Sequence, residues 1–263
     1  MSGYAELEYD EHDGVVVLRV GRAERRNAMG RAFFEELPEA MRDIARLHPR
    51  AVIVRGRADG GLSVGFDTTE IGQLAQMSTR EFVFYEEAAS SGYGAVRNLP
   101  CPTIAVIDGP AVGGGLALAM ACDIRVASPR ALFVAAFVKL GLSVGELGSS
   151  YALTRAIGPG RAAELAFTGR PVGADEALAW GLVQSVHDDA HAAARDLAGQ
   201  IRANSPAGIH LSKLALIHNQ EIHSYEAARD LENRGQAILT ETEDTREAID
   251  AFAQKRAPRF RGA

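Results

Sequence analysis

The sequence predicts an α/β fold followed by a purely helical C-terminal region. Two observations predict this organisation. Up to about residue 187, short apolar segments typical of strands alternate with amphipathic segments typical of helices, and glycines mark the joints between them. From residue 188 to residue 263 the apolar spacing is helical alone. With 263 residues, of which 47% are hydrophobic, the chain is long enough to bury a large core.

The α/β part begins with a predicted hairpin and continues with alternating helices and strands. The segments ELEYD and VVVLRV flank the turn signal EHDG. From Arg31 to Leu47 apolar residues recur every three or four positions, which predicts an amphipathic helix that Pro38 would kink. We then predict the strand AVIVRG, a helix from Thr69 to Arg97, the strand PTIAVIDG, an apolar helix after GGG and the strand DIRVAS.

The region 188–263 is predicted to form helices only. Its segments AHAAARDLAGQIRANSP, PAGIHLSKLALIHNQ, SYEAARDLENRGQAILT and TREAIDAFAQKRAP carry helical apolar spacing with almost no strand signal. A tail of this kind covers its own core or a neighbouring subunit, so we expect an oligomer.

The composition argues against several classes of function. A net charge of −6 does not favour a nucleic-acid partner. Two cysteines without a CxxC pair and seven histidines without an HExxH motif predict neither a disulfide framework nor a metal site. The polar, acidic N-terminus is unlike a signal peptide, and no apolar run reaches the roughly 18 residues that cross a bilayer. We therefore expect a soluble cytoplasmic protein with no membrane partner.

Two glycine-containing loops are the best candidates for a binding site. The triple glycine 113–115 precedes an apolar helix and leaves several N–H groups unobstructed at the positive end of the helix dipole. The loop GRADGGLSVGFDTTEI follows a strand and could aim another N–H at the same point. Two converging donors would stabilise negative charge on a carbonyl oxygen by roughly 3 to 4 kcal/mol each. Alternatively, the glycines allow close packing, and Asp67 is a helix N-cap.

Six segments, in order along nearly the whole chain, resemble one enzyme family. They are RRNAM, SVGFD, GPAVGGGLALAMACDIRVAS, KLGLSVGELGSSYALTRAIG, AFTGRPVGADEALAWGLVQSV and AFAQKRAPRF. The chain resembles the crotonase superfamily of enoyl-CoA hydratases and isomerases. This resemblance implies a crotonase-type spiral of repeated β-β-α units with a C-terminal helical region that mediates trimerisation. It also implies homotrimers or dimers of trimers and an acyl-CoA substrate, with coenzyme A entering as part of the thioester and no separate cofactor.

The resemblance also assigns roles to individual residues. By motif, the backbone N–H groups of Val64 and Gly114 form the oxyanion hole for the thioester carbonyl. The residues that correspond to positions lining the coenzyme A groove are Asn27, Ala28, Phe66 and Asp67. Phe252 and Lys255 correspond to positions near the adenine and phosphate end of coenzyme A, so the helical region would complete that site.

The acid-base residues depart from the family pattern. Hydratases that resemble this chain carry two glutamates where it has Ala117 and Phe137, neither of which can accept a proton. Glu146 resembles the single acid of some family isomerases, although the match needs a one-residue gap after Gly141. One carboxylate can move a double bond from the 3 to the 2 position, and an apolar pocket would raise its pKa usefully. Alternatively, Glu146 is a helix-start residue that the helix dipole stabilises.

Three other functions remain open from the sequence. Glu146 could activate water, alone or with another group brought in by folding, and so support hydration of a 2-enoyl-CoA. The chain could instead bind acyl-CoA without catalysis. A remote alternative is a serine hydrolase, because GLSVG contains Ser143 in a GxSxG motif and Asp175 and His187 follow in the required order.

Overall fold

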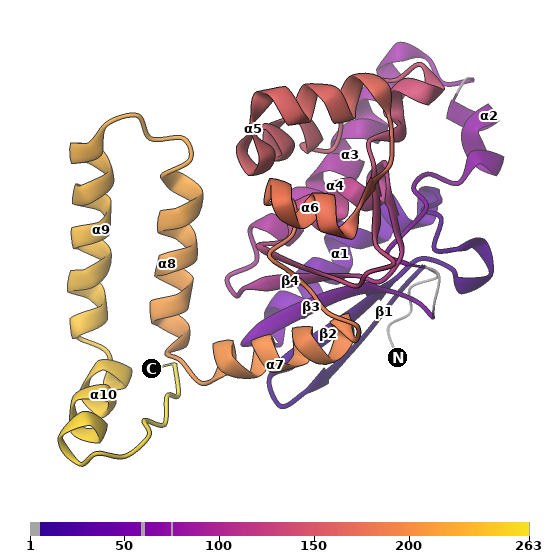
Figure 1. Cartoon of the computed structure of the whole chain (residues 1–263). Coiled ribbons are helices and arrows are strands. Elements are labelled where there is room, and N and C mark those ends of the chain that lie inside the picture. Colours follow the sequence, from indigo (N-terminus) through magenta and orange to yellow (C-terminus); the bar gives the residue numbers. More distant parts are fainter. Residues whose placement is uncertain (1–5, 59–60, 75, 263) are drawn as a thin grey trace.

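A computed structural model describes residues 6–58, 61–74 and 76–262 of the chain. Two sheets organise it (Figure 1). The larger sheet has the strand order β1-β2-β3-β4-β6-β9, with bounds Leu7–His12, Val15–Val20, Ala51–Gly56, Thr103–Ile107, Ile124–Ala127 and Ser185–Val186. The smaller sheet has the order β5-β7-β8, with bounds Pro110–Val112, Leu132–Val134 and Val172–Gly173.

The chain winds between these sheets as a spiral. Strand β4 belongs to the larger sheet, β5 to the smaller one, and helix α4 (Gly114–Ala121) follows. The next turn repeats this path through β6, β7, the 3-10 helix η3 (Ala136–Leu140) and helix α5 (Ser149–Thr168). Strands β2, β3, β4, β6 and β9 pair in parallel, and only the hairpin strand β1 is antiparallel in that sheet. The predicted spiral of β-β-α units is confirmed.

The remaining helices lie around and beyond the two sheets. They are η1 (Ala23–Arg25), α1 (Arg31–Arg46), η2 (Thr68–Glu70), α2 (Ile71–Leu74), α3 (Thr79–Arg97), α6 (Ala174–Trp180), α7 (Ala190–Arg202), α8 (Pro206–His218), α9 (Tyr225–Thr240) and α10 (Glu243–Ala253). The predicted hairpin and the helix from Arg31 are confirmed, with Pro38 inside α1.

The single helix predicted from Thr69 to Arg97 is wrong, because the structure divides this segment into η2, α2 and α3. Helix α3 has its own start at Ser78. The Ser78 hydroxyl accepts a hydrogen bond from the Glu81 N–H, and the Glu81 carboxylate accepts one from the Ser78 N–H. This capping box satisfies two backbone donors and is worth about 1 kcal/mol, which fixes where α3 begins.

Helices cover both faces of the larger sheet. On one face, α1, α3 and α4 bury a large core that includes Phe33, Leu37 and Leu116. On the other face, α7 buries Ala190, Ala194 and Ala198, whose spacing of four residues forms one stripe against the strands. The boundary predicted at residue 187 places α7 in the C-terminal helical region. In the structure, these three alanines pack α7 against the larger sheet.

Helices α8, α9 and α10 form an arm that projects from this body (Figure 1). The arm is held at its base, where His210 Nδ1 lies 3.0 Å from the Pro100 carbonyl oxygen. In α8 the buried Lys213 Nζ donates to the Cys101 carbonyl at 2.9 Å and to Asp123 Oδ2 at 2.8 Å. Asp123 Oδ2 also accepts from the Thr103 N–H. The ion pair between Lys213 and Asp123 therefore attaches the arm to strand β4 and to the end of α4.

Replacing Lys213 with methionine should destabilise the protein by about 2 kcal/mol, because the substitution leaves Asp123 without its cation. Denaturant unfolding measures this change. The double variant Lys213→Met with Asp123→Asn should recover part of the loss, since the amide still accepts from Thr103 and carries no charge. Equal stability of Lys213→Met and the parent would contradict the role of this ion pair.

Candidate active site

The triple glycine starts α4, and its backbone conformation and surroundings favour glycine there. A Cβ on Gly115 would lie 2.7 Å from the Ser63 carbonyl oxygen, and Gly113 has a φ of 50°. The Gly113 N–H donates to the Val134 carbonyl, and the Gly113 carbonyl accepts from Ala117. The Gly114 N–H has no acceptor within the described part of the chain. It is therefore an unused donor at a helix N-terminus.

A second unused donor comes from the SVGFD loop, at Phe66. Met29 forms a parallel bridge with Phe66: the Met29 N–H donates to the Gly65 carbonyl, and the Asp67 N–H donates to the Met29 carbonyl. In such a bridge the N–H of Phe66 itself points away from Met29, and no acceptor for it lies among the described residues. A Cβ on Gly65 would lie 2.7 Å from the Val112 carbonyl oxygen and 3.9 Å from the Gly113 Cα. The loop thus brings Phe66 beside the start of α4.

The predicted donor Val64 does not have a free N–H group. Its N–H donates to the Arg26 carbonyl oxygen at 3.3 Å. Next to it, the Ser63 N–H donates to Pro110 and the Ser63 carbonyl accepts from Val112, which attaches the loop to β5. The structure therefore corrects the sequence prediction: Phe66, predicted only to line a groove, replaces Val64 as the candidate partner of Gly114.

Tyr93 of α3 supports the peptide group of Gly114. Its hydroxyl donates to the Gly114 carbonyl at 3.1 Å and lies 3.5 Å from Met29 Sδ. Tyr93 is buried, and its ring stacks on Phe34, which also stacks on Phe66. Both candidate donors are therefore packed against the same aromatic cluster. No pattern in the sequence singles out Tyr93, because the spacing of residues does not show which side of α3 faces α4.

Glu146 lies in the loop between η3 and α5, next to a residue that packs against the start of α4. The next residue, Leu147, is buried, and its Cδ1 would lie 3.8 Å from a Cβ on Gly114. Helix α5 begins at Ser149 with Gly148 as its N-cap, so the Glu146 carboxylate does not cap it. The Glu146 backbone carbonyl accepts from the Ser149 N–H instead. The Glu146 carboxylate therefore makes no capping bond to α5, and no described residue donates a hydrogen bond to it.

The Glu146 carboxylate faces a cavity of about 520 Å³ between its loop and α3. Apolar side chains that line this cavity include Phe82, Val83 and Leu142. Burial, and secondarily the nearby carboxylate of Glu86, raises the pKa of Glu146 to about 7. A carboxyl with this pKa is present in both forms near neutral pH, as a group that accepts and returns a proton must be.

The raised pKa predicts a pH-dependent effect of Glu146→Gln on stability. The folded chain holds the Glu146 proton more tightly than the unfolded chain, whose carboxyl titrates near 4.5. The parent therefore loses stability as the pH rises from 4.5 through about 7. At pH 8 the neutral variant should be more stable than the parent by about 1 to 3 kcal/mol, and at pH 4 the two should be equal. Urea unfolding at both pH values measures the difference, and a pH-independent gap would contradict the burial of this carboxylate.

The two positions predicted to lack acids are apolar and buried. Ala117 is 1% exposed and lies in the first turns of α4, and Phe137 is 6% exposed and lies in η3. Neither position offers a proton acceptor next to Glu146. The acid-base chemistry available here therefore comes from the loop before α5 and from α3.

Asn27 and Ala28, predicted to line a coenzyme A groove, are buried and stabilise loops. Asn27 has a φ of 58°, and its Nδ2 donates to the carbonyls of Arg57 and Gly61 at 3.0 and 2.9 Å. These bonds hold the loop after β3 against the RRNAM segment. Residues 59 and 60 of the GRADGGLSVGFDTTEI loop lie outside the described residues.

Asp67 is buried and makes structural contacts. Its Oδ2 accepts from Arg22 at 2.7 Å, and its Oδ1 accepts from the Thr69 hydroxyl and N–H at 2.6 and 2.9 Å. The hydrogen bonds from Thr69 and Arg22 lower the pKa of Asp67. This geometry supports the alternative that Asp67 caps a helix, here the 3-10 helix η2. Asp67 thereby fixes the segment that follows the Phe66 donor.

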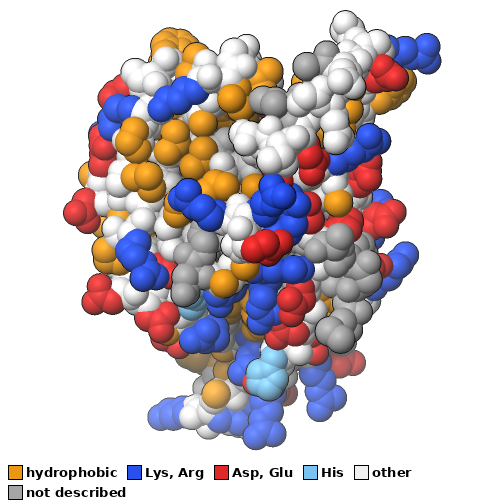
Figure 2. All heavy atoms as spheres, turned by 90° about the vertical axis from the view of Figure 1, so that its right-hand side faces the viewer, with side chains coloured by type: hydrophobic (Ala, Val, Ile, Leu, Met, Phe, Trp, Pro, Cys, Tyr) orange, Lys and Arg blue, Asp and Glu red, His pale blue; other side chains and the backbone are white. Residues whose placement is uncertain are grey.

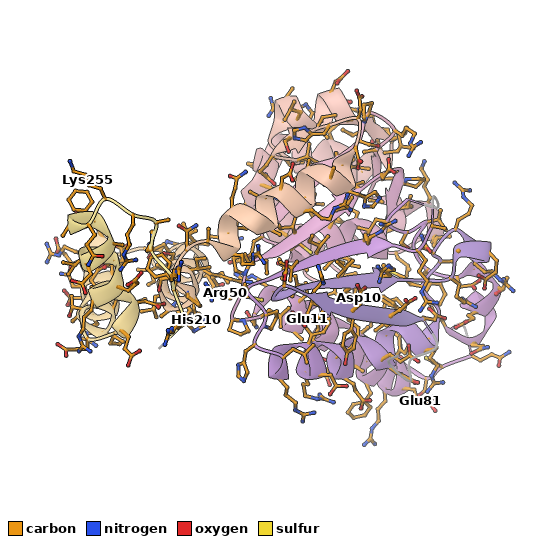
Figure 3. The ribbon with its side chains drawn as sticks, turned by 90° about the horizontal axis from the view of Figure 1, so that it is seen from below. Asp10, Glu11, Arg50, Glu81, His210 and Lys255 are labelled. Carbon is orange, nitrogen blue, oxygen red and sulfur yellow. The ribbon has the colours of Figure 1, made fainter. Side chains whose placement is uncertain are left out.

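Phe252 and Lys255 lie on or just after α10, far from the other candidate residues. Figure 3 shows Lys255 at the outer end of the arm, opposite Glu81 at the start of α3. Phe252 is 88% exposed. Within one chain the structure does not bring these two residues to Gly114 or Glu146.

The GLSVG segment lacks the geometry of a nucleophile elbow. The 3-10 helix η3 precedes it instead of a strand, and the Ser143 hydroxyl accepts from the Gly145 N–H at 3.0 Å. No hydrogen bond joins Ser143 to His187 among the residues that the structure describes. The structure therefore does not support the serine hydrolase alternative.

Charged side chains of both signs share one face of the molecule (Figure 2). Figure 2 shows basic and acidic side chains intermixed on one face of the molecule, with a hydrophobic patch near its upper edge. Within residues 6–58, 61–74 and 76–262, no helix is long and apolar enough to cross a membrane. In the same ranges no three His, Cys, Asp or Glu side chains are grouped as a metal ion would require.

Comparison with known families identifies the family to which this fold belongs. The family model described as enoyl-CoA hydratase/isomerase matches residues 10–263. The chain belongs to this family. The prediction of membership in the crotonase superfamily is confirmed.

Relatives and solved structures of the enoyl-CoA hydratase/isomerase family cover almost all of the chain. The mitochondrial methylglutaconyl-CoA hydratase of Mus musculus is 35% identical over 260 residues, which cover 96% of this chain and 81% of that protein. The enoyl-CoA isomerase/hydratase fer4 of Mycosarcoma maydis is 34% identical over 278 residues, covering 99% and 98%. The structure of an enoyl-CoA hydratase from Bacillus anthracis matches with a TM-score of 0.91 at 29% identity, covering 98% and 100%.

Proposed function

We propose that this enzyme converts an acyl-CoA thioester through an enolate, with Glu146 as the acid-base group. The observation that carries the proposal is the half-buried Glu146 carboxylate on the loop whose Leu147 packs against Gly114, one of the two residues with unused N–H groups. A thioester oxygen bound to both N–H groups would be held where negative charge is stabilised as it develops. Tyr93 and the Met29 bridge keep these donors in place.

The net reaction that one carboxylate and two N–H donors support best is isomerisation of a 3-enoyl-CoA to a 2-enoyl-CoA. The Glu146 carboxylate takes a proton from C2, and the electrons of that C–H bond move onto the thioester oxygen. The two N–H donors stabilise the resulting dienolate. Glu146 then returns the proton to C4, while the double bond shifts from C3–C4 to C2–C3. One group performs both proton transfers, so the reaction needs no second acid at the positions of the buried Ala117 and Phe137.

Hydration of a 2-enoyl-CoA is the second candidate. Hydration is favoured by the names of several relatives, including the methylglutaconyl-CoA hydratase that is 35% identical to this chain. In this reaction Glu146 would remove a proton from water as the oxygen adds to C3, and the protonated Glu146 would then give that proton to C2. The same oxyanion hole would stabilise the enolate of the hydrated thioester, as it would the dienolate of isomerisation.

The product separates the two candidates. Purified enzyme is supplied in turn with a 3-enoyl-CoA and a 2-enoyl-CoA of the same chain length, and products are followed by mass and by absorbance of the conjugated thioester. Isomerisation gives 2-enoyl-CoA from the first substrate and no gain in mass. Rapid formation of a 3-hydroxyacyl-CoA from the second, without isomerisation of the first, would favour hydration. No turnover of either, with binding of both, would favour the non-catalytic alternative.

We also propose that the arm completes the coenzyme A site between chains of a trimer or a dimer of trimers. This assignment is supported by the exposure of Phe252 and by the position of Lys255 at the end of the arm, away from its own body. A cation at that place suits the phosphates of coenzyme A, and an exposed aromatic ring suits its adenine. The cytoplasmic location stays a prediction.

A further inference from the structure

Helix α3 holds a second carboxylate at a fixed place relative to the oxyanion hole. The helix is attached to α4 by the Tyr93 hydroxyl, which donates to the Gly114 carbonyl at 3.1 Å. It also packs closely against α1, where a Cβ on Gly92 would lie 3.0 Å from Leu37 Cδ2. Glu86 lies seven residues before Tyr93, so both project from the same face of α3. The placement of Tyr93 therefore also sets where Glu86 points.

The carboxylates of Glu86 and Glu146 line one cavity from opposite elements. Glu86 and Phe82 come from α3, and Glu146 and Leu142 come from the loop before α5. The other charged group on the wall is the exposed Glu87, and no Lys, Arg or His lines this cavity in the part of the chain that the structure describes. The two half-buried carboxylates thus face each other without a cation to compensate both.

We propose that Glu86 is a positioning residue that sets the protonation of Glu146, so that the pair of carboxylates holds one proton between them at neutral pH. This inference rests on the proposed function, because it concerns the group that moves the substrate proton. Two like charges in one apolar cavity are avoided when one carboxylate keeps a proton. Glu146 is then ready both to accept a proton at C2 and to return one.

The surrounding groups support this role. Burial raises the pKa of Glu86, as it does that of Glu146, where the charge of Glu86 adds to the effect of burial. The phenols of Tyr85 and Tyr93 also border the pair, and burial, followed by nearby carboxylates, raises the pKa of each. These phenols stay neutral near pH 7, so Glu86 is the neighbour whose charge can change with Glu146.

A titration of the Glu146 carboxyl group tests the proposal without relying on activity. The carboxyl carbons of ¹³C-labelled glutamate are followed by NMR from pH 4 to pH 9, and the Glu146 signal is assigned by its loss in Glu146→Gln. In Glu86→Gln the midpoint of Glu146 should fall by about 0.5 to 1 pH unit, because the like charge is gone. Glu87→Gln is the matched control, as it removes an exposed charge one position away and should leave the midpoint unchanged.

The pH profile of substrate α-proton exchange provides the second readout. The acid limb should move to lower pH by the same amount in Glu86→Gln, while the plateau stays within about threefold of the parent. Glu86→Asp should retain the parent profile. An unchanged Glu146 midpoint in Glu86→Gln would overturn the proposal, and so would loss of exchange at every pH, which would make Glu86 a direct acid. If Glu146→Gln exchanges protons like the parent, the proposed function fails, while the NMR midpoint still decides the role of Glu86.

Discussion

Replacing Glu146 with glutamine should lower the turnover of a 3-enoyl-CoA by about 10² to 10⁴-fold. The amide preserves the size of the side chain but cannot accept a proton from C2 at neutral pH. Substrate binding should change little, because the N–H donors of Gly114 and Phe66 and the packing around Leu147 are untouched. Steady-state kinetics of both proteins, with KM and kcat determined separately, measures the effect.

The control for this variant is Ser143→Ala, in the same loop. Among the described residues the Ser143 hydroxyl has one hydrogen bond, accepted from the Gly145 N–H, so its removal should leave kcat within about threefold of the parent. A large loss in Ser143→Ala with little loss in Glu146→Gln would revive the serine nucleophile and contradict the acid-base role of Glu146.

Replacing Gly114 with proline should lower kcat by about 10² to 10³-fold, because proline has no N–H group to offer the thioester oxygen. Gly114 is the first residue of α4, where the proline ring suits the backbone of a helix start. Rates of isomerisation, measured together with the circular dichroism of the folded protein, test this expectation.

Gly114→Ala is the matched control for this substitution. Either replacement adds a Cβ that would lie 3.2 Å from Met29 Sδ and from the Tyr93 hydroxyl, so both carry a similar steric cost. Only alanine keeps the N–H donor, and its loss of activity should stay within about tenfold. Equal activity of the proline and alanine variants would rule out the Gly114 N–H as an oxyanion donor.

The order of elements was accessible from the sequence because local patterns determine it. The stripe of apolar residues in α1 and the alternation of β1 and β2 reflect which side of each element is buried. The break before α3 also has a local signal, because Ser78 and Glu81 have the spacing of a capping box, although the apolar pattern alone predicts one continuous helix. The sequence also predicts N–H donors at the triple glycine, because glycines have no side chains to obstruct them. It likewise predicts that Ala117 and Phe137 supply no acid, because the residue types are visible in the sequence itself.

The geometry of the site could not be predicted because it depends on which elements meet. Val64 and Phe66 are two residues apart, and only the Arg26 contact and the bridge to Met29 show which N–H is free. Glu86 is one of several acids in α3. The Tyr93 contact shows which side of α3 is turned toward α4, and Glu86 lies on that side and lines the cavity. For Lys255, the arm carries the residue away from its own chain's site, which no local pattern indicates.

The most direct test of Glu146 as the enolate-forming base is exchange of the C2 protons of a saturated acyl-CoA in deuterated water. This reaction requires removal of the α-proton and an oxyanion hole, and it is independent of whether the enzyme isomerises or hydrates. We expect the parent to incorporate deuterium at C2, as followed by mass spectrometry, and Glu146→Gln to do so at least about 10²-fold more slowly. Equal incorporation by the two proteins would contradict the account.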